Sequence, residues 1–464
     1  MKNKLKISYK KLSIGSLVAI SIAGVFSIRS LTGMAEYGFS LVSYYLLAAI
    51  LFFIPSSLIF SELATIFPQD GGLYIWVREA LGEKLGFLAI WLEWSNNIVS
   101  MPTMLSFGAV TLIYLVHPAW MKYHYLIFFL MLCFIWGLTY LNIYNIKLSL
   151  KFSAISAIIG ALLPVLFLIL LGFFWLFFAK SEIHMSIKDL IPHLHLHNIA
   201  LLSGLILSFA GMQVVAFHAR DVDNPQKNYP RAMLIAAIII VIVSIAGALA
   251  IAIVIPKEKL SLVAGLLQIF QEFLHYFHLD ILFLGISSLL FIGFIANFNL
   301  WLLSPARGLQ ACAKYGYMPK MLSGSYDKPH RILIMQSIIA SLLCLLFIFL
   351  PSLNNSYWLL TVLCAQLTFI MDILIAISAI KLRYSKPNLP RLYRIPGGQF
   401  FGIYLVSGVM IIVCIIAFII GFFPPTDLIQ IDNKLFYDIF LIVMIVMIIS
   451  CSFIISIIRQ KKNY

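Results

Sequence analysis

Two short polar segments with the same pattern lie inside long apolar stretches of the sequence. Residues 21–24 read Ser-Ile-Ala-Gly, and residues 208–211 read Ser-Phe-Ala-Gly. Glycine tolerates backbone that leaves the helical conformation, and backbone freed inside a membrane has N–H and C=O groups that must find partners. Such groups could bind the carboxylate and the ammonium of a small zwitterion. We therefore expect unwound backbone within residues 22–26 and 208–214, with the two segments facing each other near the bilayer midplane.

The two segments predict a ligand site built mainly from backbone groups. Free amides at the first segment would hold a carboxylate, and free carbonyls at the second would hold an ammonium. The alternative is that each Ala-Gly pair is an ordinary small-residue contact between packed helices. The candidate binding residues are Ala23, Gly24 and Val25 in the first segment and Ser208, Phe209, Gly211 and Gln213 in the second.

Ionisable residues within apolar stretches form a second group of candidates, because a charge at the centre of a membrane helix costs about 2.5–3.5 kcal/mol. Asp372 and Glu93 are such residues, and each could bind an ammonium group or carry a proton. The alternatives are a hydrogen-bonded structural Asp372 and a Glu93 that pairs with a loop cation. Glu62, at the end of an apolar stretch, is interpreted as structural. Arg29 either attracts a carboxylate or extends to the interface and pairs with Glu36.

Aromatic and histidine residues are further candidates. Trp301, Phe209 and Phe298 could close over a ligand, although aromatic side chains in membrane helices more often serve packing. One loop contains four histidines, which are His184, His193, His195 and His197. We expect a solvated loop there, and a zinc site is the alternative. No phosphate-binding glycine loop, catalytic triad pattern or metalloprotease motif is present, so we expect no enzymatic activity, no cofactor and no metal.

The composition places all these candidates in a membrane. Hydrophobic residues make up 62% of the 464 residues and charged residues 11%, whereas soluble domains have about 45–50% and 25%. A helix that crosses a bilayer needs about 20 apolar residues, and the sequence contains twelve such stretches. They lie near residues 13–34, 38–66, 86–115, 124–143, 152–178, 198–218, 232–255, 280–304, 331–350, 355–381, 400–423 and 435–458. The six cysteines have no short spacing and predict neither disulfides nor a zinc site.

The positive charges predict how these spans are oriented. Twelve spans place both termini on one side, and 25 of the 32 Lys and Arg residues fall in the tails and loops of that side. Positively charged loops stay in the cytoplasm, so both termini are expected there. Orientation then explains the net charge of +14, which does not indicate nucleic acid binding. The charged start leads into an apolar run without a cleavage site, which predicts an uncleaved first span.

The expected organisation is a ten-helix core followed by two accessory spans. The boundaries are a cytoplasmic N-tail at 1–12, the core at 13–381 with repeats at about 13–178 and 198–381, a cytoplasmic loop at 382–399, the accessory helices at 400–458 and a cytoplasmic C-tail at 459–464. We also expect an outer surface helix within 256–279 and a short cytoplasmic helix at 306–315. The two matching segments lie five helices apart, in the first and sixth spans, as in transporters built from two inverted repeats.

Several short motifs follow one another along nearly the whole chain. They are Gly38-Phe39-Ser40-Leu41, Trp76-Val77-Arg78-Glu79-Ala80-Leu81-Gly82, Asp223-Asn224-Pro225 with Tyr229-Pro230, Ser304-Pro305-Ala306-Arg307-Gly308, Arg394-Ile395-Pro396-Gly397-Gly398 and Phe423-Pro424-Pro425. With these motifs the chain resembles the amino acid–polyamine–organocation superfamily, and within it the glutamate/GABA antiporter family. The resemblance implies an all-α membrane protein with a LeuT-type fold, which is a 5+5 inverted repeat plus two C-terminal helices. It also implies that Trp301 and the third span line the transport cavity.

The chain departs from that family at two membrane positions. Gln213 and Asn297 stand where glutamate/GABA exchangers are expected to carry Glu. Proton sensing through those two carboxylates is therefore not expected, and we keep both amides as candidates for substrate binding. The sequence ends at Tyr464, so we do not expect the C-terminal plug of the family's acid-sensing members.

The predicted function is a secondary transporter of the bacterial inner membrane. It would exchange an amino acid for another amino acid or for its decarboxylated amine, by alternating access around broken first and sixth helices. Its partners would be a small amino acid and the lipid bilayer, and a homodimer stays open. The first alternative is a proton-coupled amino acid symporter that uses Asp372. The second is a non-transporting sensor, which would need a soluble output domain that we do not find.

Overall fold

The fold is all-helical wherever it is described. The computed structural model describes residues 13–67, 72–144, 146–192, 196–212, 224–256, 259–313, 329–350, 352–425 and 434–462. The α-helices in these ranges are α1 (Ile14–Val25), α2 (Ser30–Ala35), α3 (Leu41–Ala48), α4 (Ile54–Ile66), α5 (Gly72–Leu81), α6 (Glu83–Val116), α7 (His124–Tyr144), α8 (Ile146–Phe178), α9 (Leu196–Ser208), α11 (Pro225–Ala252), α12 (Gly265–Tyr276), α13 (Leu282–Ala313), α15 (His330–Cys344), α16 (Leu346–Phe349), α17 (Leu353–Ser385), α18 (Phe401–Ile420) and α19 (Lys434–Lys462).

Nine helical stretches in the described ranges are long and apolar enough to cross a membrane. They are Gly38–Ile66, Glu83–Val116, His124–Tyr144, Lys227–Ala252, Leu282–Gln310, His330–Phe349, Leu353–Ser385, Phe401–Ile420 and Lys434–Ile458. Each overlaps one of the predicted spans, so the chain is a polytopic membrane protein.

The other three predicted spans are not among these nine. The span at 13–34 is divided between α1 and α2, and α8 contributes only the shorter apolar stretch Leu162–Phe178. Beyond Met212, the span at 198–218 lies outside the described residues. The count of twelve spans, the inverted repeat and the domain boundaries therefore remain predictions.

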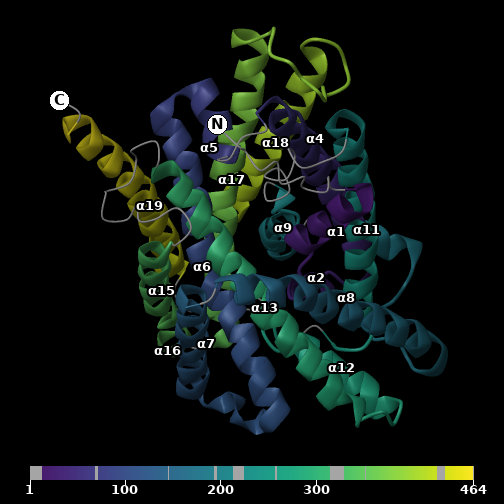
Figure 1. Cartoon of the computed structure of the whole chain (residues 1–464). Coiled ribbons are helices and arrows are strands. Elements are labelled where there is room, and N and C mark those ends of the chain that lie inside the picture. The colour runs from purple at the N-terminus through teal and green to yellow at the C-terminus, as the bar shows by residue number, and fades with distance from the viewer. Residues whose placement is uncertain are drawn as a thin grey trace, which may run out of the picture.

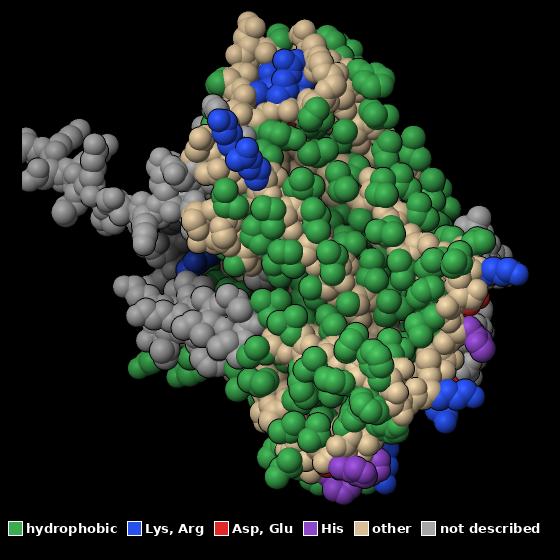
Figure 2. Space-filling model, turned by 90° about the vertical axis from the view of Figure 1, so that its right-hand side faces the viewer, with side chains coloured by type: hydrophobic (Ala, Val, Ile, Leu, Met, Phe, Trp, Pro, Cys, Tyr) green, Lys and Arg blue, Asp and Glu red, His purple; other side chains and the backbone are tan. Residues whose placement is uncertain are grey.

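The long helices α6, α13 and α17 form the centre of the bundle. α17 packs against α6 and α18, and α13 packs against α6 and α8 (Figure 1). The link between α17 and α18 lies at the same end of the molecule as α5, and α12 lies at the opposite end (Figure 1). Figure 2 shows hydrophobic side chains over the middle of one face, with Lys, Arg and His near its ends and edges. This distribution is the one that a lipid-facing surface requires.

The first helix is interrupted later than the sequence predicted. Helical hydrogen bonding continues to Val25, and the Phe26 N–H still donates to the Ile22 carbonyl at 2.8 Å. The backbone is extended at Phe26, and helix resumes at Ser30. The prediction of unwinding at 22–26 is therefore wrong for residues 22–25, because Gly24 tolerates a helical conformation as well as an unwound one.

The second interruption begins where α9 ends, at Ser208. Phe209 and Ala210 donate to the Ile206 and Leu207 carbonyls in a tighter final turn, and Gly211 has a φ of 119°. This interruption starts within the predicted interval 208–214, of which residues 213–214 lie outside the described chain. A Cβ atom at Gly211 would lie 2.5 Å from the Gly24 carbonyl oxygen, so the two interruptions touch through their backbones.

Two other helical predictions have mixed outcomes. The predicted helix within 256–279 is present as α12, and its apolar residues, among them Phe270 and Phe273, are buried. The short separate helix predicted at 306–315 is wrong, because α13 runs unbroken through Pro305 to Ala313. Leu302, Ala306 and Leu309 are all buried, so the same helix face stays packed across the proline and compensates for the hydrogen bond that proline removes.

A buried ion cluster joins α4 to the end of α17. Arg383 donates two hydrogen bonds of 2.6 Å to the two carboxylate oxygens of Glu62, and both side chains are 2–3% exposed. The N–H of Ile395 also donates to Glu62, at 2.9 Å, and Arg391 Nε lies 3.4 Å from it. Glu62 therefore has the structural role that the sequence predicted, and it anchors the chain between α17 and α18.

A second ion pair at the same end is more exposed. Lys386 and Arg78 both donate to the Glu79 carboxylate, and these hydrogen bonds hold the pKa of Glu79 below its ordinary value. A lowered carboxyl pKa means that the contact stabilises the fold at neutral pH and that this contribution is lost as acid protonates Glu79.

Gly211→Ala should destabilise the fold. An alanine at this positive φ costs about 1–3 kcal/mol in backbone strain, and its methyl group would press on the Gly24 carbonyl. Thermal unfolding of the purified protein in detergent measures the effect. Gly285→Ala is the control: it lies in α13 with no atom within 4 Å of the added Cβ, and alanine is favoured over glycine in a helix by about 1 kcal/mol. Equal stability of the two variants would contradict the contact.

Glu62→Gln should destabilise the protein much more than Glu79→Gln. The first change leaves the buried Arg383 guanidinium without its carboxylate, which costs about 3–5 kcal/mol, whereas a surface pair contributes about 0–1 kcal/mol. The same thermal unfolding measurement compares the two variants. If both unfold at the same temperature, the buried cluster does not hold the two segments together.

Candidate functional site

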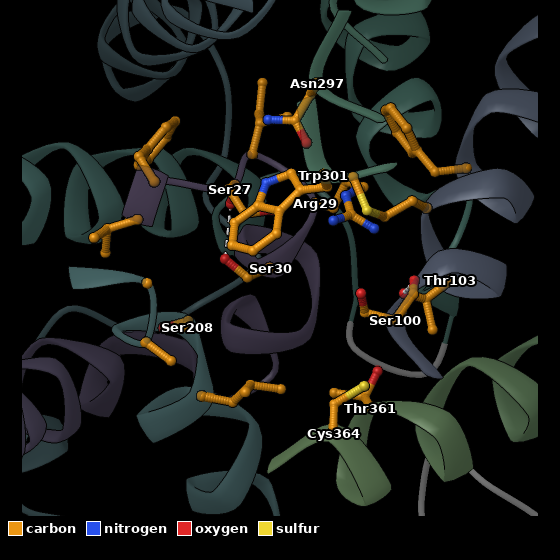
Figure 3. Close-up of a pocket in the computed structure, with 18 of the residues that line it drawn as sticks. Ser27, Arg29, Ser30, Ser100, Thr103, Ser208, Asn297, Trp301, Thr361 and Cys364 are labelled. Carbon is orange, nitrogen blue, oxygen red and sulfur yellow. Dashed lines mark hydrogen bonds between the residues drawn. The ribbon is translucent and has the colours of Figure 1, made fainter. Parts of the chain in front are cut away.

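A cavity of about 220 Å³ lies where the two helix interruptions meet. One water molecule needs roughly 10–15 Å³ of such space, so the cavity can hold a small organic molecule. Its walls come from the segment between α1 and α2, from the end of α9, and from α6, α8, α13 and α17 (Figure 3).

Six of the predicted binding residues line this cavity. They are Gly24, Val25, Ser208, Gly211, Asn297 and Trp301. Asn297 and Trp301 are four residues apart on α13, and so they lie on one helix face (Figure 3). The structure thus brings together residues that are nearly 280 positions apart in the sequence.

Other predicted residues lie elsewhere. Phe209 is 1% exposed and stacks on Phe53 with ring centroids 4.7 Å apart, so it supports the wall and does not face the cavity. Phe298 is fully buried beside Phe294. Ala23 lies in the last turn of α1. Gln213 lies outside the described residues.

Asp372 and Glu93 are both buried but neither lines the cavity. Asp372 is 2% exposed and Glu93 is 6% exposed. They lie on α17 and α6, beyond the segments of those helices that form the wall.

The backbone amides available to a ligand are not the predicted ones. Residues 23–25 belong to α1, where N–H groups are bonded to the preceding turn and only the last carbonyls are free. The N–H groups of Ser27, Ile28 and Arg29 instead have no hydrogen-bond partner among the described residues. All three residues line the cavity. The carboxylate is therefore expected at Ser27–Arg29, and the Gly24–Val25 carbonyls suit an ammonium.

Arg29 lies in the cavity wall. Its guanidinium makes no hydrogen bond or ion pair with the residues that the structure describes, Glu36 included. Figure 3 shows it directed into the space between Trp301 and the side chains from α6 and α17. Of the two sequence interpretations, the geometry favours attraction of a carboxylate over pairing with Glu36.

Sequence reasoning placed the third span at the cavity but did not single out the rows of hydroxyl groups on two of its walls. Ser100 and Thr103 of α6 face the cavity beside Asn97, and α17 contributes Thr361 beside Tyr357 and Cys364. Positions 357, 361 and 364 lie on one face of a helix. Polar residues at this helical spacing within an apolar stretch could therefore have predicted the row from the sequence.

The hydroxyl groups of these rows present hydrogen-bond acceptors to the cavity. Ser100 donates to the Asn97 carbonyl at 2.8 Å, Thr103 to the Ser100 carbonyl at 2.7 Å and Thr361 to the Tyr357 carbonyl at 2.7 Å. Because each hydroxyl proton is used within its own helix, the oxygens are left as acceptors. Both amide atoms of Asn97 are buried without a partner in the described structure. The cavity thus offers donors near Arg29 and acceptors on the walls, as an amino acid zwitterion requires.

Most of the predicted histidine loop lies outside the part of the chain whose side chains the structure describes. His184 lies in the described chain, whereas His193 and His195 lie outside it. No group of three or more potential metal ligands occurs among the residues that the structure describes.

Comparisons with known proteins show the family of the chain. A family model described as amino acid permease matches residues 12–448. An uncharacterized transporter of Legionella pneumophila is 40% identical over 438 residues, covering 94% of each chain. A glutamate/gamma-aminobutyrate antiporter of Lactococcus lactis is 28% identical, over 99% of this chain and 92% of its own. A probable agmatine/putrescine antiporter of the same species is 26% identical over 88% of each chain. The resemblance to the superfamily is therefore confirmed, and the chain belongs to the amino acid permease family of membrane transporters.

Proposed function

We propose that this chain exchanges an amino acid for another amino acid, or for its decarboxylated amine, across the bacterial inner membrane. The substrate would occupy the cavity between the two helix interruptions, which would open alternately to either side. Both termini and the α17–α18 link would face the cytoplasm, in agreement with the distribution of Lys and Arg. A homodimer is compatible with this proposal but is not needed for it.

The observation that carries the proposal is the guanidinium of Arg29, which lies in the cavity wall and has no ion-pair partner among the residues that the structure describes. A cation inside a membrane protein is costly unless a partner neutralises it. A substrate carboxylate would supply that charge and would also accept hydrogen bonds from the free N–H groups at Ser27–Arg29. The ammonium would then lie toward the carbonyls of Gly24 and Ser208 and the acceptor oxygens of α6 and α17. Asn297 and Trp301 would complete the wall beside it.

The relatives support exchange as the mode of transport. Two of them are named for an exchange in which one substrate is the other with a group removed: glutamate against gamma-aminobutyrate, and agmatine against putrescine. A site that fixes one charged end of the substrate and tolerates change at the other would serve such pairs. The identity of the exchanged molecules stays open, because Gln213 and Asn297 are amides at positions where the resemblance leads us to expect acids.

A proton-coupled amino acid symporter is the second candidate. The observation that favours it is Asp372, a carboxyl group buried in the membrane outside the cavity. Exchange and symport differ in whether net uptake occurs without an internal substrate.

Counterflow should reveal the exchange directly. Proteoliposomes loaded in turn with single amino acids and amines should take up a labelled amino acid only when a suitable internal substrate is present. Empty vesicles and vesicles without protein are the controls. Uptake of equal size into empty vesicles under a proton gradient would favour the symporter, and no uptake with any pair would contradict transport of this class.

Arg29→Gln should weaken binding of substrates that carry a carboxylate. Loss of one partner of a buried charge pair costs about 2–5 kcal/mol, which is roughly 30-fold or more in the dissociation constant. Amines without a carboxylate should not lose affinity, because they make no use of the guanidinium. Arg307→Gln, at an exposed position of α13, is the matched control. Equal loss for amino acids and amines would show that Arg29 shapes the site without binding the carboxylate.

A further inference from the structure

A buried carboxyl group lies on α17 with little to stabilise its charge. Asp372 is 2% exposed, and its Oδ1 atom has no hydrogen-bond partner among the described residues. The described Lys and Arg residues form no ion pair with it. An ionised carboxylate in such a place is strongly unfavourable, whereas the protonated form is tolerated.

The neighbours of Asp372 add to this preference. Among the described residues, the titratable groups that interact with it are Glu93 on α6 and Cys414 on α18. The other helices that contact α17, which are α4, α5, α9, α16 and α19, present no such group to it in the described chain. Glu93 is itself 6% exposed. A negative charge on Glu93 would oppose a negative charge on Asp372.

Asp372 and Glu93 both lie away from the proposed substrate cavity. Cys364 of α17 lines the cavity and its thiol contacts the Asn96 carbonyl of α6 at 3.6 Å. Asp372 follows Cys364 by eight residues, which is about 12 Å along the helix axis, and Glu93 precedes Asn96 by three residues, or about 4.5 Å. Both displacements point to the end of the bundle that holds the Glu62–Arg383 pair. The end of α17 meets α5 there through Lys386 and Glu79, and α5 directly precedes the start of α6.

We propose that Asp372 is a proton-binding site of the transport cycle, separate from the substrate cavity and placed between it and the end of the bundle assigned to the cytoplasm. The carboxyl group holds its proton while the site is closed off and releases it to water when the pathway opens at that end. Glu93 faces this site and opposes a second negative charge there. The proposal rests on the proposed transport function, and it assigns Asp372 a proton instead of the substrate ammonium, because a ligand in the cavity does not reach it.

Infrared spectroscopy of the purified protein tests the bound proton without any transport. A protonated carboxylic acid has a carbonyl stretching band that shifts in heavy water and that an ionised carboxylate lacks. We expect this band at neutral pH in the wild type and its loss in Asp372→Asn. Asp280→Asn, which changes an exposed aspartate, is the matched control and should keep the band. A wild-type spectrum without the band, or an unchanged band in Asp372→Asn, would overturn the proposal.

Glu93→Gln tests the same proton site with Asp372 unchanged. Its result therefore does not depend on whether Asp372→Asn folds. Removal of the facing acid makes a negative charge on Asp372 easier to form, so the band should disappear at a lower pH than in the wild type. An unchanged pH of disappearance would show that Glu93 does not act on this proton.

Transport then tests the coupling. A proton gradient should change the rate of exchange by the wild type in vesicles that contain an internal substrate. Asp372→Asn should lose this response while counterflow without a gradient remains, because Asn resembles the protonated form in shape. An undiminished response to the gradient in a folded Asp372→Asn variant would contradict the coupling role. Absence of counterflow in the wild type would instead refute the proposed exchange. The infrared measurement would still show whether Asp372 binds a proton.

Discussion

Backbone that leaves the helical conformation inside a membrane must line a cavity or find new partners for its polar groups. This constraint organises the structure. Helix α1 ends at Val25 and α9 at Ser208, and the two ends touch where Gly211 approaches the Gly24 carbonyl. The cavity lies beside that contact, and the long helices α6, α13 and α17 supply most of its remaining wall. Ser27, Ile28 and Arg29, whose N–H groups have no hydrogen-bond partner among the described residues, line this space.

Two ionisable side chains inside the membrane, Arg29 and Asp372, lie in different surroundings. Arg29 is fixed at the cavity, where a mobile anion can neutralise it. Asp372 is buried on α17 outside the cavity lining, and there we propose that a proton neutralises it. A substrate and a proton would thus occupy different places along α17, and coupling between them would run through movement of that helix against α6.

The sequence predicts the long helices well because a membrane span depends on length and hydropathy alone. It predicts the cavity only in part. Gly24 and Gly211 mark the right helices, but a glycine permits unwinding without locating it, and the break falls after Val25. Sequence also does not distinguish a helix that continues from one that restarts, as α13 shows beyond Pro305. The direction of an aromatic side chain such as Phe209 depends on packing partners from distant helices, which one sequence does not reveal.

The most direct test of this account is a structure of the protein with a bound amino acid identified by counterflow. The account predicts that the substrate carboxylate lies within hydrogen-bonding distance of the Arg29 guanidinium and the Ser27–Arg29 amides, with the ammonium toward the Gly24 and Ser208 carbonyls and Asp372 out of contact. A substrate bound with its ammonium against Asp372, or an Arg29 side chain turned away toward Glu36, would contradict it.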